Sequence, residues 1–549
     1  MFCNQCEQTI QGSGCTKVGV CGKNPETAAL QDLLTFAVRG LSEVAVAGRK
    51  VGVKEPDINR FIVKAIFSTL TNVNFDPARL QDLIYETVEK RDELRCEIVG
   101  AGGADQYGDP AASLKPAADI ADLVKQGEEV RLPVDWEREA DIRSLQELTL
   151  YGIRGAAAYA DHAAILGQED DAVYASLLDK LAKITDKSLG ARDWVDFALD
   201  TGKTNLRAME LLDAGNTTHF GHPEPSMVSL GHKVGKAILV TGHDLKDLAN
   251  LLQQTEGQEV NIYTHGEMLP SHAYPELKKY SHLAGHFGSA WQNQKKELPD
   301  FPGPVLFTTN CIQEPAASYQ DKVFTTGLVA WPGTKHVQND DFGPLIEHAG
   351  QMPGFAKDEE SGAVWVGYGR NTVLRDHPMG RVIDTLVDYV KAGTIKHFFL
   401  VGGCDGAKPG RNYYTEFVER APQDTVILTL ACGKFRFFDR DLGAIDGVPR
   451  LIDVGQCNDA YSAIVVADAL SDALGKGIND IPLSLILSWY EQKAVAILLT
   501  LLHKGFKGIR LGPSMPAFLT SNGPNVLLER FDVQPIDTPE KDIAACLAI

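Results

Sequence analysis

The stretch KAILVTGHDLKDLANLLQQ, residues 236–254, decides the fold class of this chain. It begins with an apolar, β-branched run that ends at Thr241, turns at Gly242 and His243, and continues as an amphipathic segment to Gln254. A short apolar run followed by an amphipathic segment is typical of a strand that leads into a helix. The same alternation recurs toward the end of the chain, which predicts βαβ units and parallel sheets.

The residues before this stretch follow a different pattern, in which apolar residues recur at helical spacing. Such windows lie at residues 26–46, 57–71, 77–97, 145–166, 171–185 and 194–212. They predict a helical domain over residues 1–224, arranged as two bundles of three helices. Two α/β domains with mainly parallel sheets are expected at residues 225–377 and 378–549, and the strands of the first end with AVWVGYG, residues 363–369. The expected fold class is a multidomain α and α/β protein.

The chain has 549 residues, a formal net charge of -20 and ten cysteines. This acidic balance argues against nucleic acid or an anionic membrane surface as a partner. The sequence has no run of about 18 apolar residues, and its first residues, MFCNQCEQT, lack the basic start and apolar middle of a secretion signal. We therefore expect a cytoplasmic protein, in which disulfides are rare and clustered cysteines indicate metal or redox chemistry.

Six potential metal ligands directly follow short apolar runs of the predicted α/β domains. The runs AILVTG, NIYTHG, VLFTTN, HFFLVGG, VILTLA and LIDVGQ precede, in this order, His243, Glu267, Cys311, Cys404, Cys432 and Cys457. In open α/β sheets, ligands bind outside the carboxyl ends of the strands, so these residues are expected to share one site. The alternative is that the cysteines are buried as small apolar residues of the core.

Four further cysteines form the pattern C-x2-C-x8-C-x5-C within the first 21 residues: Cys3, Cys6, Cys15 and Cys21. Four thiolates this close in sequence can enclose one metal centre, and soft sulfur ligands suit zinc or iron-sulfur clusters. Structural zinc is usually held by two CxxC pairs or by Cys and His together. One CxxC followed by two single cysteines fits an electron-carrying cluster better, with structural zinc as the alternative.

The downstream ligands differ in kind because they combine thiolates with imidazole and carboxylate. This mixture indicates an asymmetric iron site at which a small molecule can bind, and it favours catalysis over electron transfer. The segment PLSLILSWYEQKAVAILLTLLHKG, residues 482–505, reads as one buried helix that carries Glu491 and Lys493. Two residues apart on a helix, these charges are poorly placed to pair with each other, so each is expected to need another partner, such as the metal site. The alternative is a solvated notch in the helix.

No segment completes the G-x-G-x-x-G fingerprint that leads from a strand into a helix, although VGYGRN and VGGCDG are glycine-containing turns. We therefore expect that the chain binds no nicotinamide dinucleotide and that a separate redox protein supplies electrons. The sequence carries no prediction of the oligomeric state.

The chain closely resembles the hybrid-cluster protein family, also called prismane proteins and classed as hydroxylamine reductases. The segments that carry the resemblance are MFCNQCEQT, TGHDLKDL, YTHGEMLP, TTNCI, GGCDGA, LTLACGK, GQCNDAYSA and SWYEQKA. They span essentially the whole chain. The resemblance implies a helical amino-terminal domain followed by two Rossmann-like α/β domains, as in the related carbon monoxide dehydrogenases.

The resemblance also implies the ligands of two clusters. Cys3, Cys6, Cys15 and Cys21 would hold a cubane cluster, and their short gaps look like the [4Fe-4S] type. A hybrid [4Fe-2O-2S] cluster would lie at the domain junction, with Lys493 beside it. Its ligands would be His243, Glu267, Cys311, Cys404, Cys432, Cys457 and Glu491. Cys404 matches the position that carries a persulfide in the family.

The activity implied by the resemblance is reduction of hydroxylamine to ammonia and water with two electrons and two protons. Glu491, Lys493 and Cys404 are the expected catalytic residues, with Lys493 or a neighbouring carboxylate as the proton donor. Two alternatives stay open. One is reduction of nitric oxide to nitrous oxide at the same cluster. The other is a regulatory protein that senses nitric oxide in nitrosative stress or passes nitrosyl groups to partner thiols.

Overall fold

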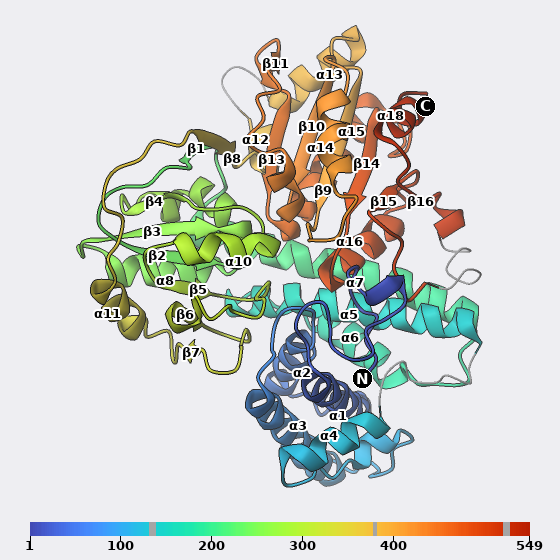
Figure 1. Ribbon diagram of the computed structural model, residues 1–549. Helices are drawn as coiled ribbons and strands as arrows, with labels where there is room; N and C mark the ends of the chain where they lie inside the picture. The colour runs from blue at the N-terminus through green and yellow to red at the C-terminus, as the bar shows by residue number, and fades with distance from the viewer. Residues whose placement is uncertain (131–138, 377–380, 520–527, 549) are drawn as a thin grey trace.

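The computed structural model describes residues 1–130, 139–376, 381–519 and 528–548. Figure 1 shows a helical amino-terminal part, two separate sheets, and long helices that run between these parts. The expected boundary between the two α/β domains, at residues 377 and 378, lies outside the described residues. Among the described helices, none is both long enough and apolar enough to cross a membrane.

Long helices form the first part of the chain, as the apolar spacing predicts. Proline in the first turn fixes the start of the first helices, and Asn24 caps the first by accepting a hydrogen bond from the Thr27 backbone N–H. The six predicted helices are α1 (Pro25–Lys50), α2 (Pro56–Ser68), α3 (Pro77–Gly100), α5 (Ala140–Ile165), α6 (Asp171–Lys183) and α7 (Ala191–Phe220).

One further helix, α4 (Ile120–Glu129), was not predicted from the sequence. It is too short to show several repeats of the apolar spacing, and only Leu123 and Gly127 of it are fully buried. In the helical part, α1 packs against α2, α3, α4 and α6, whereas α5 packs against α2 and α7. The helices α5 and α7 also contact a helix from the carboxyl-terminal part, α16 (Gln492–His503).

The first sheet has parallel strands in the order β4-β3-β2-β5-β6-β7. They are β2 (Lys236–Thr241), β3 (Val260–His265), β4 (Leu283–His286), β5 (Val305–Phe307), β6 (Val323–Thr325) and β7 (Lys335–His336). The helix α8 (Leu245–Thr255) follows β2, as predicted, and Asp244 caps it by accepting a hydrogen bond from the Lys246 backbone N–H. The other helices of this part are α9 (Pro275–Lys278), α10 (Gln294–Glu297) and α11 (Gly343–Gln351).

The second sheet is also parallel, in the order β13-β10-β9-β14-β15-β16. Its strands are β9 (His397–Gly403), β10 (Thr425–Leu430), β13 (Leu451–Gly455), β14 (Leu483–Ser488), β15 (Arg510–Gly512) and β16 (Gln534–Pro535). The helices of this part are α13 (Val382–Ala392), α14 (Asn412–Arg420), α15 (Ala460–Leu474), α16 and α18 (Pro539–Leu547). The short helix α12 (Arg370–Leu374) precedes them and contacts α13 and α15. A two-stranded ribbon joins β11 (Ala444–Ile445) to β12 (Val448–Pro449). The expected class of α and α/β architecture with parallel sheets is confirmed (Figure 1).

Two local expectations are wrong. The run AVWVGYG contains β8 (Ala363–Val366), which pairs antiparallel with β1 (Ser226–Ser229) and does not join the first parallel sheet. Residues 482–505, expected to form one helix, form the strand β14, a short link and then α16. A strand covered on both faces and a buried helix both read as continuous apolar runs, so apolar spacing does not distinguish them.

Candidate metal centres

The six candidate ligands of the two α/β parts lie at the carboxyl ends of parallel strands. In chain order they follow β2, β3, β5, β9, β10 and β13, and they are His243, Glu267, Cys311, Cys404, Cys432 and Cys457. The first three come from one sheet and the last three from the other. Because contacts between them cross from one sheet to the other, one group of side chains is built from both sheets.

Glu267 makes these contacts. Its Oε1 accepts a hydrogen bond from the Cys432 thiol at 3.1 Å, and its Oε2 accepts one from the Cys457 backbone N–H at 2.8 Å. His243 Nε2 lies 3.2 Å from Glu267 Oε2. Donor atoms of His243, Glu267 and Cys457 all lie within 4.8 Å of one another, and the three residues are buried. Such a set of nitrogen, oxygen and sulfur donors can hold a metal ion.

Thr309 and Gln456 orient these ligands. The Thr309 hydroxyl lies 3.0 Å from His243 Nδ1, and a proton on Nδ1 leaves the lone pair of Nε2 free for a metal. Gln456 Nε2 donates hydrogen bonds to the backbone oxygens of His243 and Glu267, at 3.2 and 2.8 Å. Neither Thr309 nor Gln456 was predicted. The available signal was their place within TTNCI and GQCND, next to or near an expected ligand.

The turns that carry the cysteines have unusual backbone conformations. Cys311 has a φ of 68°, and Ala431, which precedes Cys432, has a φ of 62°. Gly403 precedes Cys404 with a φ of 106°, and a Cβ at this position would lie 2.1 Å from the Ser488 carbonyl oxygen. Residues other than glycine rarely adopt such φ values, and they keep them where the surrounding structure holds them, often at ligand sites.

Glu491 and Lys493 lie at the start of α16. Glu491 is the N-cap residue, and its Oε2 accepts a hydrogen bond from the Lys493 backbone N–H at 2.7 Å. Lys493 Nζ lies 3.2 Å from both His243 Nε2 and Asn310 Oδ1, and 3.7 Å from Glu491 Oε1. The two charges do form an ion pair, contrary to the poor placement expected on one helix, because an N-cap residue stands outside the helical turn. Lys493 also has the further partners that were expected. Their exposed fractions, 4% and 1%, contradict the solvated notch.

Burial favours the neutral form of the four thiols in this group. Together with the Glu491 and Glu267 carboxylates, it raises the pKa of Cys404 to about 12. Burial also raises the pKa of the other three thiols, those of Cys311, Cys432 and Cys457. Metals bind the thiolate form, so metal binding at this site would release protons and supply the positive charge that the buried thiolates need.

Lys493 supplies positive charge to the same site. Burial alone would lower the pKa of Lys493, but the surrounding acidic groups, Cys457 and Glu491 foremost, outweigh it and raise this pKa. Burial alone would raise the pKa of Glu267, but His243 and Lys493 outweigh it and lower this pKa below its usual range. The ammonium of Lys493 and the carboxylate of Glu267 are therefore both charged.

The four amino-terminal cysteines also come together. Cys3 and Cys15 exchange two backbone hydrogen bonds, of 3.0 and 2.8 Å. Burial, followed by the charges on Cys21 and Cys3, raises the pKa of the Cys6 thiol. Cys3 and Cys21 are partly exposed, whereas Cys6 and Cys15 are buried. This group of four thiols therefore reaches the surface, unlike the buried set around Glu267.

A buried ion pair ties the amino-terminal segment to the second α/β part. Arg411 donates hydrogen bonds to Glu7 Oε2 at 2.8 Å and to Ser488 Oγ at 2.6 Å. The Glu7 backbone N–H donates to the Tyr490 carbonyl oxygen at 2.9 Å, and the Tyr490 ring packs on Trp291 with ring centroids 4.4 Å apart. The sequence did not predict these contacts, although Glu7 lies within MFCNQCEQT and Tyr490 within SWYEQKA, because partners this far apart along the chain leave no periodic pattern.

Comparison with known proteins finds matches over essentially the whole chain. Residues 1–544 match the family model described as Prismane/CO dehydrogenase family. A hydroxylamine reductase of Syntrophobacter fumaroxidans is 59% identical over 547 residues, and one of Methanocella arvoryzae is 58% identical over 548 residues; each match covers 100% of both chains. A solved carbon monoxide dehydrogenase from Thermococcus sp. AM4 has 16% identity and a TM-score of 0.58, covering 99% of this chain and 90% of that chain, which shows a shared fold. The chain therefore belongs to the Prismane/CO dehydrogenase family.

Proposed function

We propose that the protein is an iron-sulfur oxidoreductase that reduces hydroxylamine to ammonia and water. Its relatives at 59% and 58% identity over the full chain are hydroxylamine reductases. The observation that carries the proposal is the buried convergence of His243, Glu267 and Cys457 with the Lys493 ammonium beside them. This arrangement combines metal ligands with a group that can hold a proton next to a bound substrate.

The residues fit an iron-sulfur-oxygen cluster. Thiolates suit iron bound to sulfide, and imidazole and carboxylate suit iron bound to oxygen. Asn310 adds a second observation: its Oδ1 accepts a hydrogen bond from Lys493 Nζ, whereas its buried Nδ2 has no hydrogen-bond partner among the described residues. Since a buried donor is costly when unpaired, this atom fits a site completed by a bound group.

We assign one cluster to each group of ligands. A [4Fe-4S] cluster would be held by Cys3, Cys6, Cys15 and Cys21. A hybrid [4Fe-2O-2S] cluster would be held by His243, Glu267, Cys311, Cys404, Cys432, Cys457 and Glu491, with the persulfide on Cys404. When bound, the hybrid cluster would supply electrons and a Lewis-acidic iron.

The chain's own residues would supply the protons. The balance is NH2OH + 2 e⁻ + 2 H⁺ → NH3 + H2O, and the oxygen leaves as water only if it is protonated. Lys493 holds a proton at Nζ within reach of His243 and Asn310. Glu491 keeps Lys493 in place through the hydrogen bond that it accepts from the Lys493 backbone. The other six proposed ligands of the hybrid cluster exclude bulk water from this pair, because they are mostly buried.

The cysteines also bear on the electron donor and on the cellular compartment of the protein. Cys3 and Cys21 are partly exposed, so this end of the chain would accept electrons from a separate redox protein. All ten cysteines are free thiols, which fits a reducing cytoplasm. We propose three domains, at residues 1–224, 225–377 and 378–549, with the hybrid cluster at their junction. Tyr159 of α5 lies beside Cys457, which supports a contribution of the helical domain to the site of the hybrid cluster.

Replacement of Glu491 tests this function. Glu491→Gln keeps an oxygen that can cap α16 but removes the negative charge. We expect hydroxylamine turnover to fall at least about 100-fold, with the spectrum of the first cluster unchanged. The matched control is Glu93→Gln, which changes an exposed side chain on α3 and should behave as the wild type. Wild-type turnover in Glu491→Gln would disprove the assignment of Glu491.

A further inference from the structure

A buried ammonium contacts the amino-terminal thiols. Lys23 is 4% exposed, and its Nζ lies 4.0 Å from Cys3 Sγ. A tight turn holds it there: the Gly19 backbone N–H donates to the Lys23 carbonyl oxygen at 2.7 Å, and a Cβ on Gly19 would lie 3.1 Å from Cys21 Sγ. Burial raises the pKa of the Cys21 thiol, and the charge of Lys23 acts to lower it. The charge of Lys23 therefore acts on two of the four thiols.

Arg154 of α5 brings a second buried cation to the same segment. It is 4% exposed and donates hydrogen bonds to Gln5 Oε1 and, at 3.1 Å, to Thr35 Oγ1. Its Nε has no hydrogen-bond partner among the described residues. Gln5 lies between Cys3 and Cys6 in the sequence. Because an arginine side chain stays protonated in proteins, Arg154 is a fixed positive charge next to the segment that carries the thiols.

Neither Lys23 nor Arg154 forms an ion pair with a carboxylate of the described residues. Asp32 acts on Arg154 only from beyond ion-pair distance. The buried Arg411, by contrast, pairs directly with Glu7. A buried charge is costly unless an opposite charge offsets the loss of water. Four thiolates bound to a metal centre would supply that negative charge, so the two cations fit a cluster held by the amino-terminal cysteines.

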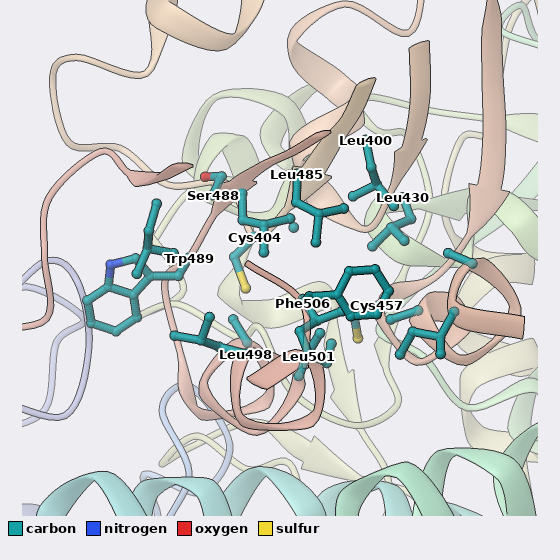
Figure 2. A pocket seen from close by; sticks show the side chains of 18 of the residues that line it. Leu400, Cys404, Leu430, Cys457, Leu485, Ser488, Trp489, Leu498, Leu501 and Phe506 are labelled. Carbon is teal, nitrogen blue, oxygen red and sulfur yellow. The ribbon is translucent and has the colours of Figure 1, made fainter. Parts of the chain in front are cut away.

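The buried group around Glu267 has a different environment on its apolar side. Cys404 and Cys457 line a cavity of about 60 Å³ among leucine and other apolar side chains, as Figure 2 shows. No lysine or arginine of the described residues lines this cavity. The positive charge of Lys493 lies instead near His243. Buried cations beside cysteine sulfur are therefore a particular feature of the amino-terminal group.

We propose that Lys23 and Arg154 raise the reduction potential of the cluster held by the amino-terminal cysteines, so that this cluster accepts an electron readily from the donor protein. Reduction by one electron adds a negative charge and breaks no bond, and nearby positive charges favour the more negative form. The two cations are positioning residues, since they act through the cluster and do not touch the substrate. The inference rests on the first cluster of the proposed function and does not require hydroxylamine turnover.

A redox titration tests Lys23 without any assay of turnover. Anaerobically purified holoprotein would be poised at the potential that reduces half of the first cluster in the wild type, and the EPR signal of this cluster measured. In Lys23→Met, we expect the ratio of reduced to oxidised cluster to fall at least about tenfold, which is a midpoint about 59 mV more negative for one electron. Lys23→Arg keeps the charge, so its ratio should stay within about threefold of the wild type.

Lys17→Met is the matched control, because Lys17 lies in the same cysteine-rich segment but is exposed. Water and salt screen an exposed charge, so the ratio should change by less than about twofold. Equal shifts in Lys17→Met and Lys23→Met would overturn the proposal, since they would assign the effect to the net charge of the protein and not to a buried cation.

Two further results would overturn it. One is an unchanged ratio in Lys23→Met with the iron content of the wild type. The other is an equal shift in Lys23→Arg and Lys23→Met, since that would assign the shift to packing and not to charge.

Arg154→Gln is measured in parallel and decides the proposal if Lys23→Met does not retain the first cluster. We expect a fall in the same ratio of at least about threefold, which Arg154→Lys should largely restore. An unchanged ratio in iron-loaded Arg154→Gln would contradict the inference alone. Wild-type protein without iron would contradict the assignment of the first cluster as well, so the two failures are distinguishable.

Discussion

The side chain of Lys493 contacts residues that are far from it in the sequence. Its Nζ reaches Asn310 and His243, which are 183 and 250 residues away in sequence. A buried ammonium is stable only where acidic or hydrogen-bonding groups surround it, and here the proposed ligands of the hybrid cluster provide them. On the proposed function, this fixed positive charge would protonate the oxygen of the substrate.

Removal of this charge is expected to slow the reaction and to leave the metal in place. Lys493→Met keeps most of the side-chain volume but has no proton to donate. We predict that kcat for ammonia formation falls by about 10²- to 10⁴-fold, with the iron content of the wild type. Lys507→Met, at an exposed position, is the control. Retention of wild-type kcat in Lys493→Met would rule out Lys493 as the proton donor.

Glu147 gives a prediction about stability and pH. Burial raises the pKa of Glu147 to about 7, although the hydrogen bonds that it accepts from Asn4 act to lower it. The folded protein therefore binds this proton more tightly than the unfolded chain. The resulting stability is complete below the pKa of the unfolded chain, near 4.5, and is lost as the pH rises through about 7.

Glu147→Gln removes this titration and keeps an amide oxygen that can accept from Asn4. We predict that Tm of the wild type falls more steeply than Tm of Glu147→Gln between pH 5 and pH 8, by an amount equivalent to roughly 2 kcal/mol. Thermal melts across that pH range measure it, with Glu93→Gln as the exposed control. Parallel curves for Glu147→Gln and the wild type would show that burial does not shift this pKa.

At this scale, the sequence predicts the positions of the proposed ligands better than it predicts the residues that hold them in place. Glu267 and Cys457 each follow an apolar run, so the strand pattern alone predicts where they lie. Thr309 and Gln456 act through hydrogen bonds to a ligand side chain or backbone that is distant in sequence. Such contacts leave no periodic pattern in the sequence, and only the tertiary structure brings the contacting residues together.

At the scale of elements, α16 positions the polar side of the candidate site around Glu267. Its first turn carries Lys493, and its body packs closely on α5 and α7. This approach depends on two glycines: a Cβ on Gly155 would lie 2.2 Å from the Gln492 carbonyl oxygen, and one on Gly202 would lie 2.1 Å from that of Leu499. Backbone atoms cannot move aside as a flexible side chain can, so any side chain here would displace the helix.

Gly202→Ala is therefore expected to destabilise the protein although alanine favours helices. We predict a loss of about 1–3 kcal/mol, measured as a lower Tm, together with reduced hydroxylamine turnover because α16 carries Lys493. The matched control is Gly100→Ala at the end of α3, where an added Cβ meets no atom within 4 Å. That variant should be neutral or slightly stabilised. An equal Tm for both variants would contradict the close packing of α7 on α16.

The error over residues 482–505 also belongs to this scale. The strand β14 lies between β9 and β15 and is covered on both faces, so its residues lack the alternation that marks a half-exposed strand. The apolar body of α16 follows after only a short link, and the two elements merge into one apolar segment. The long helices of the first part were predicted correctly because each shows several turns of apolar spacing.

At the scale of the whole molecule, the proposed metal ligands from distant parts of the chain form two neighbouring groups. The order of helical and α/β parts was predictable, since helical spacing gives way to short apolar runs near Lys236. The close association of the amino-terminal segment with the second sheet was not, because it depends on the pair of Glu7 and Arg411, which are 404 residues apart. This association brings the four amino-terminal cysteines close to the second α/β part, which supplies three of the proposed ligands of the buried site.

The most direct test measures metals and product in the same preparation. Anaerobically purified protein would be analysed for iron, sulfide and zinc and then assayed for ammonia formed from hydroxylamine with a chemical reductant. We predict about eight iron atoms per chain, acid-labile sulfide, and ammonia equal to the hydroxylamine consumed. Zinc without iron, or iron-loaded protein that forms no ammonia, would contradict the proposed hydroxylamine reductase.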